Sequence, residues 1–199
     1  MKNAISTTVL LVLLASAAGA QDVRYFPNLA LDHDQGLDDF LVNWYSKHLK
    51  AMGEPSLLEL AKTRAHVYRF LWLRTFHNPV AVRLNVDDDG TSVLTVRVTN
   101  GKGGYAPGAL VKNETRRLSK DYTQGFLEQV RELDYWKLPT NEAGNSRGCD
   151  GAEWILEAVK DGRYKLVVRW SPEKGAVHTL GVAMLIDLAE LKFPHDEMY

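Results

Sequence analysis

Residues that could carry metal or acid–base chemistry are spread along this chain without forming a recognisable motif. The six histidines include no two that are close enough in sequence to act as a local pair of metal ligands. Residues 85–90 imitate the start of a calcium-binding loop, but Val96 stands where such a loop needs a bidentate glutamate. We therefore expect a hairpin turn at 85–90, and we expect neither a metal nor a cofactor.

Two glutamates and one cysteine are the remaining candidates for catalysis. Glu153 and Glu157 could act together as acid and base, but we expect them to form ion pairs across a hairpin, Glu153 with Arg169 and Glu157 with Lys165. No Ser or Cys lies in the strand–turn–helix elbow of a hydrolase. Cys149 is the single cysteine, and we expect it to be a small buried side chain; a reactive thiol or an intermolecular bridge is the alternative.

The loop at residues 141–151 is the best candidate for a recognition surface. It is long for a compact domain and carries Arg147 and Asp150, and the hairpin that follows brings Trp170 to the same end of the sheet. Charged side chains beside an aromatic ring are the mixture that interfaces enrich. We therefore predict a binding site at Arg147, Asp150 and Trp170. The alternative is that the two charged residues cap main-chain groups of a turn and that Trp170 belongs to the core.

The first twenty residues have the layout of a secretory signal peptide. Lys2 precedes an apolar run at residues 9–14, which is followed by the small residues 18–20. The apolar run is too short to cross a bilayer, which takes about 20 such residues. We expect cleavage before Gln21, export to the periplasm or the cell exterior, and no membrane span after cleavage.

Hydrophobic periodicity predicts an α+β fold for the rest of the chain. Residues 21–34 are expected to form an irregular lead-in, and 35–199 a single domain. Apolar residues spaced three and four apart indicate helices at 37–50, 55–61, 119–133 and 180–191, and alternation indicates strands at 66–78, 80–86, 94–98, 109–118, 153–160 and 163–170. This order predicts an antiparallel sheet of about six strands with helices packed on its apolar face. The polar strand 109–118 is expected near an edge of the sheet.

The register of the second hairpin can also be predicted. Its turn contains Asp161 and Gly162. A three-residue loop with a left-handed Gly162 keeps Glu153 and Glu157 away from the apolar side chains of the second strand. A two-residue loop would place both glutamates among apolar residues, so we expect the three-residue loop.

Four short segments resemble a group of exported bacterial proteins that has no assigned function. They are residues 68–79 (YRFLWLRTFHNP), 103–108 (GGYAPG), 149–154 (CDGAEW) and 169–172 (RWSP). The likeness covers about residues 66–191. It implies export and supplies no catalytic residue.

These observations favour an exported, non-catalytic domain that is a binding module or a component of the cell envelope. The expected partner is a protein, a peptide or a glycan, bound through glycine-rich loops at one end of the sheet. With 24 basic and 25 acidic side chains, the chain lacks the positive charge that nucleic-acid binding requires. The alternative is a hydrolase-like enzyme with a site assembled from Arg147, Asp150, His77 or His178. Gathering of these side chains in one pocket would favour the enzyme.

Overall fold

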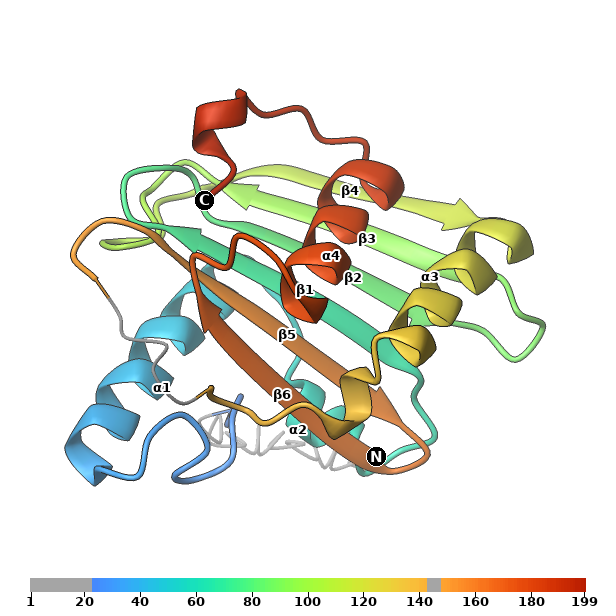
Figure 1. The fold of residues 1–199 in the computed structure, drawn as a ribbon, viewed down its shortest axis with the longest axis horizontal. Coiled ribbons are helices and arrows are strands. Elements are labelled where there is room, and N and C mark those ends of the chain that lie inside the picture. Colours follow the sequence, from blue (N-terminus) through green and yellow to red (C-terminus); the bar gives the residue numbers. More distant parts are fainter. Residues whose placement is uncertain (1–22, 143–147) are drawn as a thin grey trace, which may run out of the picture.

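A computed structural model describes residues 23–142 and 148–199 and contains one six-stranded antiparallel sheet (Figure 1). The strands are β1 (Val67–Arg74), β2 (Val80–Val86), β3 (Ser92–Thr99), β4 (Leu110–Leu118), β5 (Ala152–Lys160) and β6 (Arg163–Trp170). Their order across the sheet is β4-β3-β2-β1-β5-β6, with antiparallel pairing throughout. The predicted fold class is therefore confirmed, and β4 lies at an edge as expected. The predicted signal peptide lies outside the described residues.

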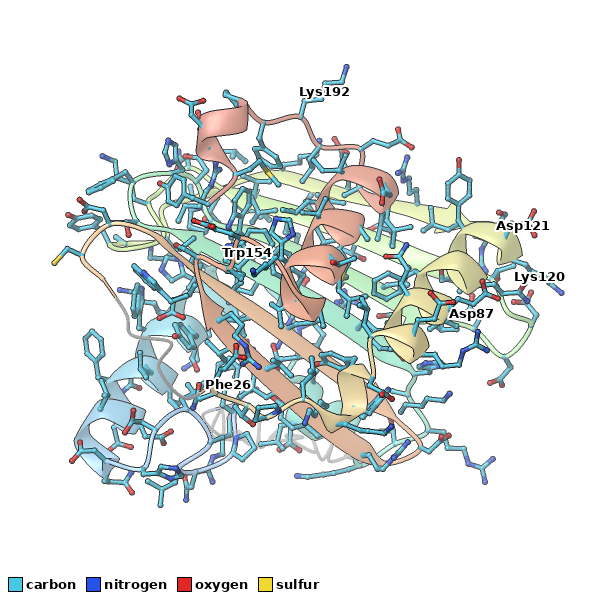
Figure 2. All side chains as sticks on the ribbon, in the orientation of Figure 1. Phe26, Asp87, Lys120, Asp121, Trp154 and Lys192 are labelled. Atoms are coloured by element: carbon cyan, nitrogen blue, oxygen red, sulfur yellow. The ribbon has the colours of Figure 1, made fainter. Side chains whose placement is uncertain are left out.

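Helices pack on both faces of this sheet. They are α1 (Gln35–Ala51), α2 (Leu57–Leu60), α3 (Lys120–Glu132) and α4 (Ala176–Val182), with short turns η1 (Tyr135–Lys137), η2 (Ala183–Leu188, a π-helix) and η3 (His195–Glu197). Figure 1 shows α3 and α4 on the near face and α1 against the far face. The central strand β1 is buried along its whole length, because alternate side chains enter two separate apolar clusters. Trp154 and Phe26, labelled in Figure 2, belong to different clusters. None of the described helices is long and apolar enough to cross a membrane.

The segment before α1 is irregular, as predicted, but it is anchored to the domain. Phe26 and Leu31 are fully buried in the cluster beneath α1. The buried carboxylate of Asp38, in the first turn of α1, accepts hydrogen bonds from the main-chain N–H groups of Leu29, Leu31 and Asp32 at 2.9, 2.9 and 3.2 Å. A carboxylate there also complements the positive end of the helix dipole. The chain therefore enters α1 in a fixed path.

The hairpin of β5 and β6 has a different register from the predicted one. Asp161 and Gly162 have φ angles of 52° and 74°, which define a two-residue loop with both residues left-handed. Glu153 consequently lies opposite Trp170, and Glu157 lies opposite Leu166. The predicted pairs of Glu153 with Arg169 and of Glu157 with Lys165 are therefore wrong. The prediction failed because Glu157 finds its partner on β1, on the other side of β5.

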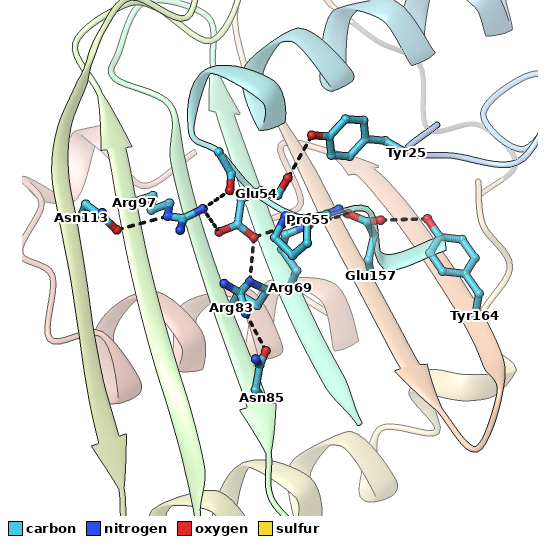
Figure 3. A network of polar contacts seen from close by, with 11 residues as sticks. Tyr25, Glu54, Pro55, Arg69, Arg83, Asn85, Arg97, Asn113, Glu157 and Tyr164 are labelled. Carbon is cyan, nitrogen blue, oxygen red and sulfur yellow. Dashed lines mark hydrogen bonds and ion pairs between the residues drawn. The ribbon is translucent and has the colours of Figure 1, made fainter. Parts of the chain in front are cut away.

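That partner belongs to a buried ionic network on the α1 side of the sheet (Figure 3). Arg69 of β1 donates to Glu157 from Nε at 2.8 Å and from Nη2 at 2.5 Å, and both side chains are fully buried. Glu54, between α1 and α2, lies 2.9 Å from Arg83 and 3.1 Å from Arg97, and 3.5 Å from Arg69. Since the arginines come from β1, β2 and β3, one carboxylate holds the α1–α2 connection against three strands.

The oxygen-rich stretch at residues 85–90 forms the expected hairpin turn between β2 and β3. The N–H of Asp87 donates to the carbonyl of Thr91 at 2.9 Å, and that of Gly90 donates to the carbonyl of Asp87 at 3.0 Å. Among the described residues, no group of three or more His, Cys, Asp and Glu side chains is arranged to hold a metal ion.

Candidate functional site

Four loop segments that are distant in sequence meet at one end of the sheet, and we call this region the loop end. They are residues 75–79, 101–108, 148–151 and 171–172. Main-chain hydrogen bonds join them: Gly104 N–H to the carbonyl of Thr75 at 3.2 Å, Thr75 N–H to the carbonyl of Gly151 at 2.8 Å, and Ser171 N–H to the carbonyl of Ala152 at 2.8 Å. Each of the four segments that carry the resemblance above contributes to this end.

The predicted binding residues have three different outcomes. Arg147 lies outside the described residues. Asp150 is exposed at the loop end, and Trp170 is partly exposed at the end of β6. The structure therefore places Asp150 and Trp170 at the same end of the sheet, as the sequence predicted. Cys149 is exposed, so the prediction of a small buried side chain is wrong.

Trp170 packs directly against the loop that carries Asp150. A Cβ atom on Gly151 would lie 2.6 Å from the indole ring, so only glycine allows this approach. On its other side, Trp170 lines a cavity of about 210 Å³ with a largely polar wall. The other lining residues are Leu31, Asp32, His33, Asn141, Glu142, Glu153 and Val168. Glu153 is fully buried at the wall of this cavity.

Two pairs of aromatic side chains lie at or beside the loop end: Phe76 with Tyr105, and Phe40 with Trp44 of α1. Phe40, Phe76 and Tyr105 are 59%, 45% and 57% exposed, although each belongs to a segment that otherwise packs on the domain. Phe40 pairs with Trp44 at 5.8 Å between ring centroids, and Phe76 pairs with Tyr105 at 6.4 Å. Trp44 Nε1–H donates to the carbonyl of Gly103 at 2.8 Å, which joins the two pairs through the 101–108 loop. Aromatic faces of this kind suit a peptide or a sugar ring.

Residues 195–199, which we call the tail, return to the loop end (Figure 1), and side chains of β1 and β5 donate hydrogen bonds to Tyr199 there. Trp72 and Trp154 are paired residues on these neighbouring strands. Their indole Nε1–H groups both donate to the main-chain oxygen of Tyr199, at 3.1 and 3.0 Å. Both indoles are fully buried, so the oxygen is held by two donors that the sheet positions rigidly.

Arg74, two residues after Trp72 on the same face of β1, supplies the positive charge of this site. Its Nη1 donates to Glu197 Oε2 at 2.8 Å and to the Glu197 carbonyl at 3.3 Å. The guanidinium lies over the rings of Trp72 and Phe193, at 4.2 and 5.0 Å from their centroids. Burial lowers the pKa of Arg74, and the charge of Glu197 opposes that shift. Arginine stays charged at neutral pH, and a buried charge of this kind favours an acidic partner.

His77 completes the tail-binding site, which we define as Trp72, Arg74, His77 and Trp154. Its Nδ1 lies 2.7 Å from the hydroxyl oxygen of Tyr199, and its Nε2 lies 3.8 Å from Glu197 Oε1. Burial raises the pKa of the Tyr199 phenol, although the positive charge of Arg74 opposes that shift. The phenol is therefore protonated at neutral pH and can donate to His77.

Two of the residues named for a hydrolase-like enzyme lie at this site: His77 contacts the tail, and the ring of His178 stacks on that of Trp154 with 5.5 Å between the centroids. Asp150 is exposed at the loop end, and Arg147 lies outside the described residues. Sequence reasoning missed Arg74 and the tail. The sequence does contain a sign of Arg74: at every second position from Tyr68 to Phe76 the residue is aromatic, except at Arg74.

Comparisons with protein-family models and with curated proteins found no match to this chain.

Proposed function

We propose that this protein is an exported, non-catalytic binding domain that recognises a protein, a peptide or a glycan at the loop end of its sheet. One observation carries the proposal: four segments distant in sequence converge there, and Phe76 and Tyr105 are exposed as a pair at the same end as the exposed Asp150. Exposed aromatic groups next to charges are typical of recognition surfaces. The signal-like first twenty residues support a site of action in the periplasm or outside the cell.

A capture experiment with a matched control tests this proposal. The tagged mature protein, with Phe76→Ala and Tyr105→Ala combined, is compared with the wild type in pull-downs from the envelope of the producing cell. The control is Tyr122→Ala on α3, because Tyr122 is 61% exposed but lies away from the loop end. We expect the wild type and the control to recover the same partner, and the double variant to recover at least tenfold less. Equal recovery by all three proteins would contradict the proposal.

A hydrolase-like activity is the alternative, and the placement of His77 and His178 at the tail-binding site is the observation in its favour. The mass of the captured partner distinguishes the two functions. If the wild type cleaves the partner and His77→Ala binds it without cleavage, the protein is an enzyme. A partner of unchanged mass after incubation with the wild type supports binding.

A further inference from the structure

The tail-binding site has the construction of a ligand site. Its indole donors come from the neighbouring strands β1 and β5, where Trp72 and Trp154 are paired in the sheet and packed in its core. The tail follows α4 and η2 through an extended stretch and contains a single 3-10 turn. Glu197 remains 31% exposed while bound. A rigid set of donors thus holds a short peptide segment.

The recognition chemistry is specific to certain features of a peptide. Trp72 and Trp154 both bind a main-chain oxygen, which any peptide offers. Arg74 requires an acidic side chain, and His77 binds a phenol two positions further along the chain. Met198, which lies between them, packs against the apolar cluster that contains both tryptophans. The site therefore selects an acidic residue, an apolar residue and tyrosine in that order.

From this geometry we infer that the tail-binding site binds an acidic–apolar–tyrosine segment of another protein, and that the tail, which carries the same pattern at Glu197, Met198 and Tyr199, competes for it in cis. This inference rests on the proposed binding function and names the ligand class. A tethered ligand competes at an effective concentration of the order of millimolar. The free site is therefore a minor state of the wild type, and weakening the tail increases the affinity for a peptide added in trans.

The test measures binding of a fluorescently labelled peptide with the sequence of residues 194–199 (PHDEMY) to the full chain. The full chain with Glu197→Ala and Tyr199→Ala combined should bind the peptide at least tenfold tighter than the wild type, because its own tail no longer competes. Adding Arg74→Gln to that variant should abolish binding. A peptide in which the same Glu and Tyr are replaced by Ala should not bind.

Circular dichroism and thermal unfolding establish that each variant is folded. If the double tail variant does not fold, Tyr199→Phe replaces it, since it removes only the hydroxyl contact with His77, and a gain of about threefold is expected. A folded tail variant that binds the peptide no better than the wild type overturns the inference. A wild-type dimer that dissociates when the peptide is added also overturns the inference, because the site would then bind the tail of a second copy of this protein. Neither result affects the Phe76 and Tyr105 experiment, so failure of the proposed function is recognised separately.

Discussion

The space around a residue decides which substitutions it can accept. Two glycines in helices differ in this respect. Gly181 in α4 lies against the core, and a Cβ atom there would be 2.6 Å from Trp154 and 2.9 Å from Phe70. Gly125 in α3 has no atom within 4 Å of the same position. Packing therefore requires glycine at position 181, whereas it does not require glycine at position 125.

We predict opposite effects of alanine at these two glycines. Gly181→Ala should lower the free energy of unfolding by about 1–3 kcal/mol, because overpacking exceeds the gain in helix propensity. Gly125→Ala should raise it by about 0.5–1 kcal/mol, because alanine favours the helix and meets no neighbour. Urea denaturation measures both. Stabilisation by Gly181→Ala would show that α4 can move away from Trp154.

His48 in α1 makes the stability depend on pH. It is fully buried, and burial, together with the nearby charge of Lys47, lowers its pKa from 6.5 to about 4. The folded protein therefore keeps His48 neutral, whereas the unfolded chain binds a proton below pH 6.5. Stability consequently falls as the pH decreases from about 6.5 towards 4, by up to about 3 kcal/mol from this group.

The prediction for His48→Gln is a shallower loss of stability between pH 7 and pH 4.5. His33→Gln, which removes an exposed histidine, is the control. The free energy of unfolding, measured in urea at several pH values, compares the three proteins. An unchanged slope in His48→Gln would show that other groups cause the pH dependence.

At the scale of elements, the buried network around Glu54 fixes the α1–α2 connection on the sheet. Glu54 faces three guanidinium groups and is 1% exposed. Loss of one partner of a buried ion pair leaves an uncompensated charge, which costs about 3–5 kcal/mol. The network is therefore sensitive to the removal of this single carboxylate.

We predict that Glu54→Gln lowers the free energy of unfolding by about 3–5 kcal/mol. The control is Arg117→Gln, which breaks the exposed pair of Arg117 with Asp87 and should cost no more than about 1 kcal/mol. Chemical denaturation monitored by circular dichroism gives both values. A loss below about 1 kcal/mol in Glu54→Gln would mean that water or a local rearrangement replaces the carboxylate.

The elements themselves were predictable from sequence, whereas their polar pairings were not. Periodicity located most of the helices and strands, because these have an apolar face with its own repeat, whereas the polar strand β4 does not. The β5–β6 register was predicted wrongly. The prediction kept Glu157 away from apolar side chains, but Arg69 on the neighbouring strand β1 neutralises its charge, so Glu157 can lie on the buried face. The burial of Phe26 was missed because the lead-in has no periodicity. For the site, the loop end was predicted, but Arg74 and the tail depend on contacts between residues more than 120 positions apart.

On the scale of the whole molecule, the two edges of the sheet are protected differently. The edge of β6 is covered by residues 138–142, and the N–H of Val168 donates to the carbonyl of Thr140 at 2.8 Å. The edge of β4 is exposed and carries Lys112, Glu114 and Arg116. Charges on an open edge oppose pairing with another chain. This arrangement suits a domain that presents its loop end to a partner.

Export is a prediction that rests on residues 1–20. Because residues 1–20 have the layout of a signal peptide, protein recovered from the producing cell should begin at Gln21. Intact-mass measurement identifies the first residue. Recovery of the full-length chain alone, and only from the cytoplasm, would contradict export.

The pairing of Trp72 and Trp154 also gives the protein an intrinsic optical signal. The two indole rings lie 5.6 Å apart at their centroids and are inclined by 63°, so their electronic transitions couple and produce an exciton band in circular dichroism. Both Nε1–H groups end on the same oxygen of Tyr199, so the electric field at both rings depends on the tail. Departure of the tail will therefore change the spectrum of the unlabelled protein.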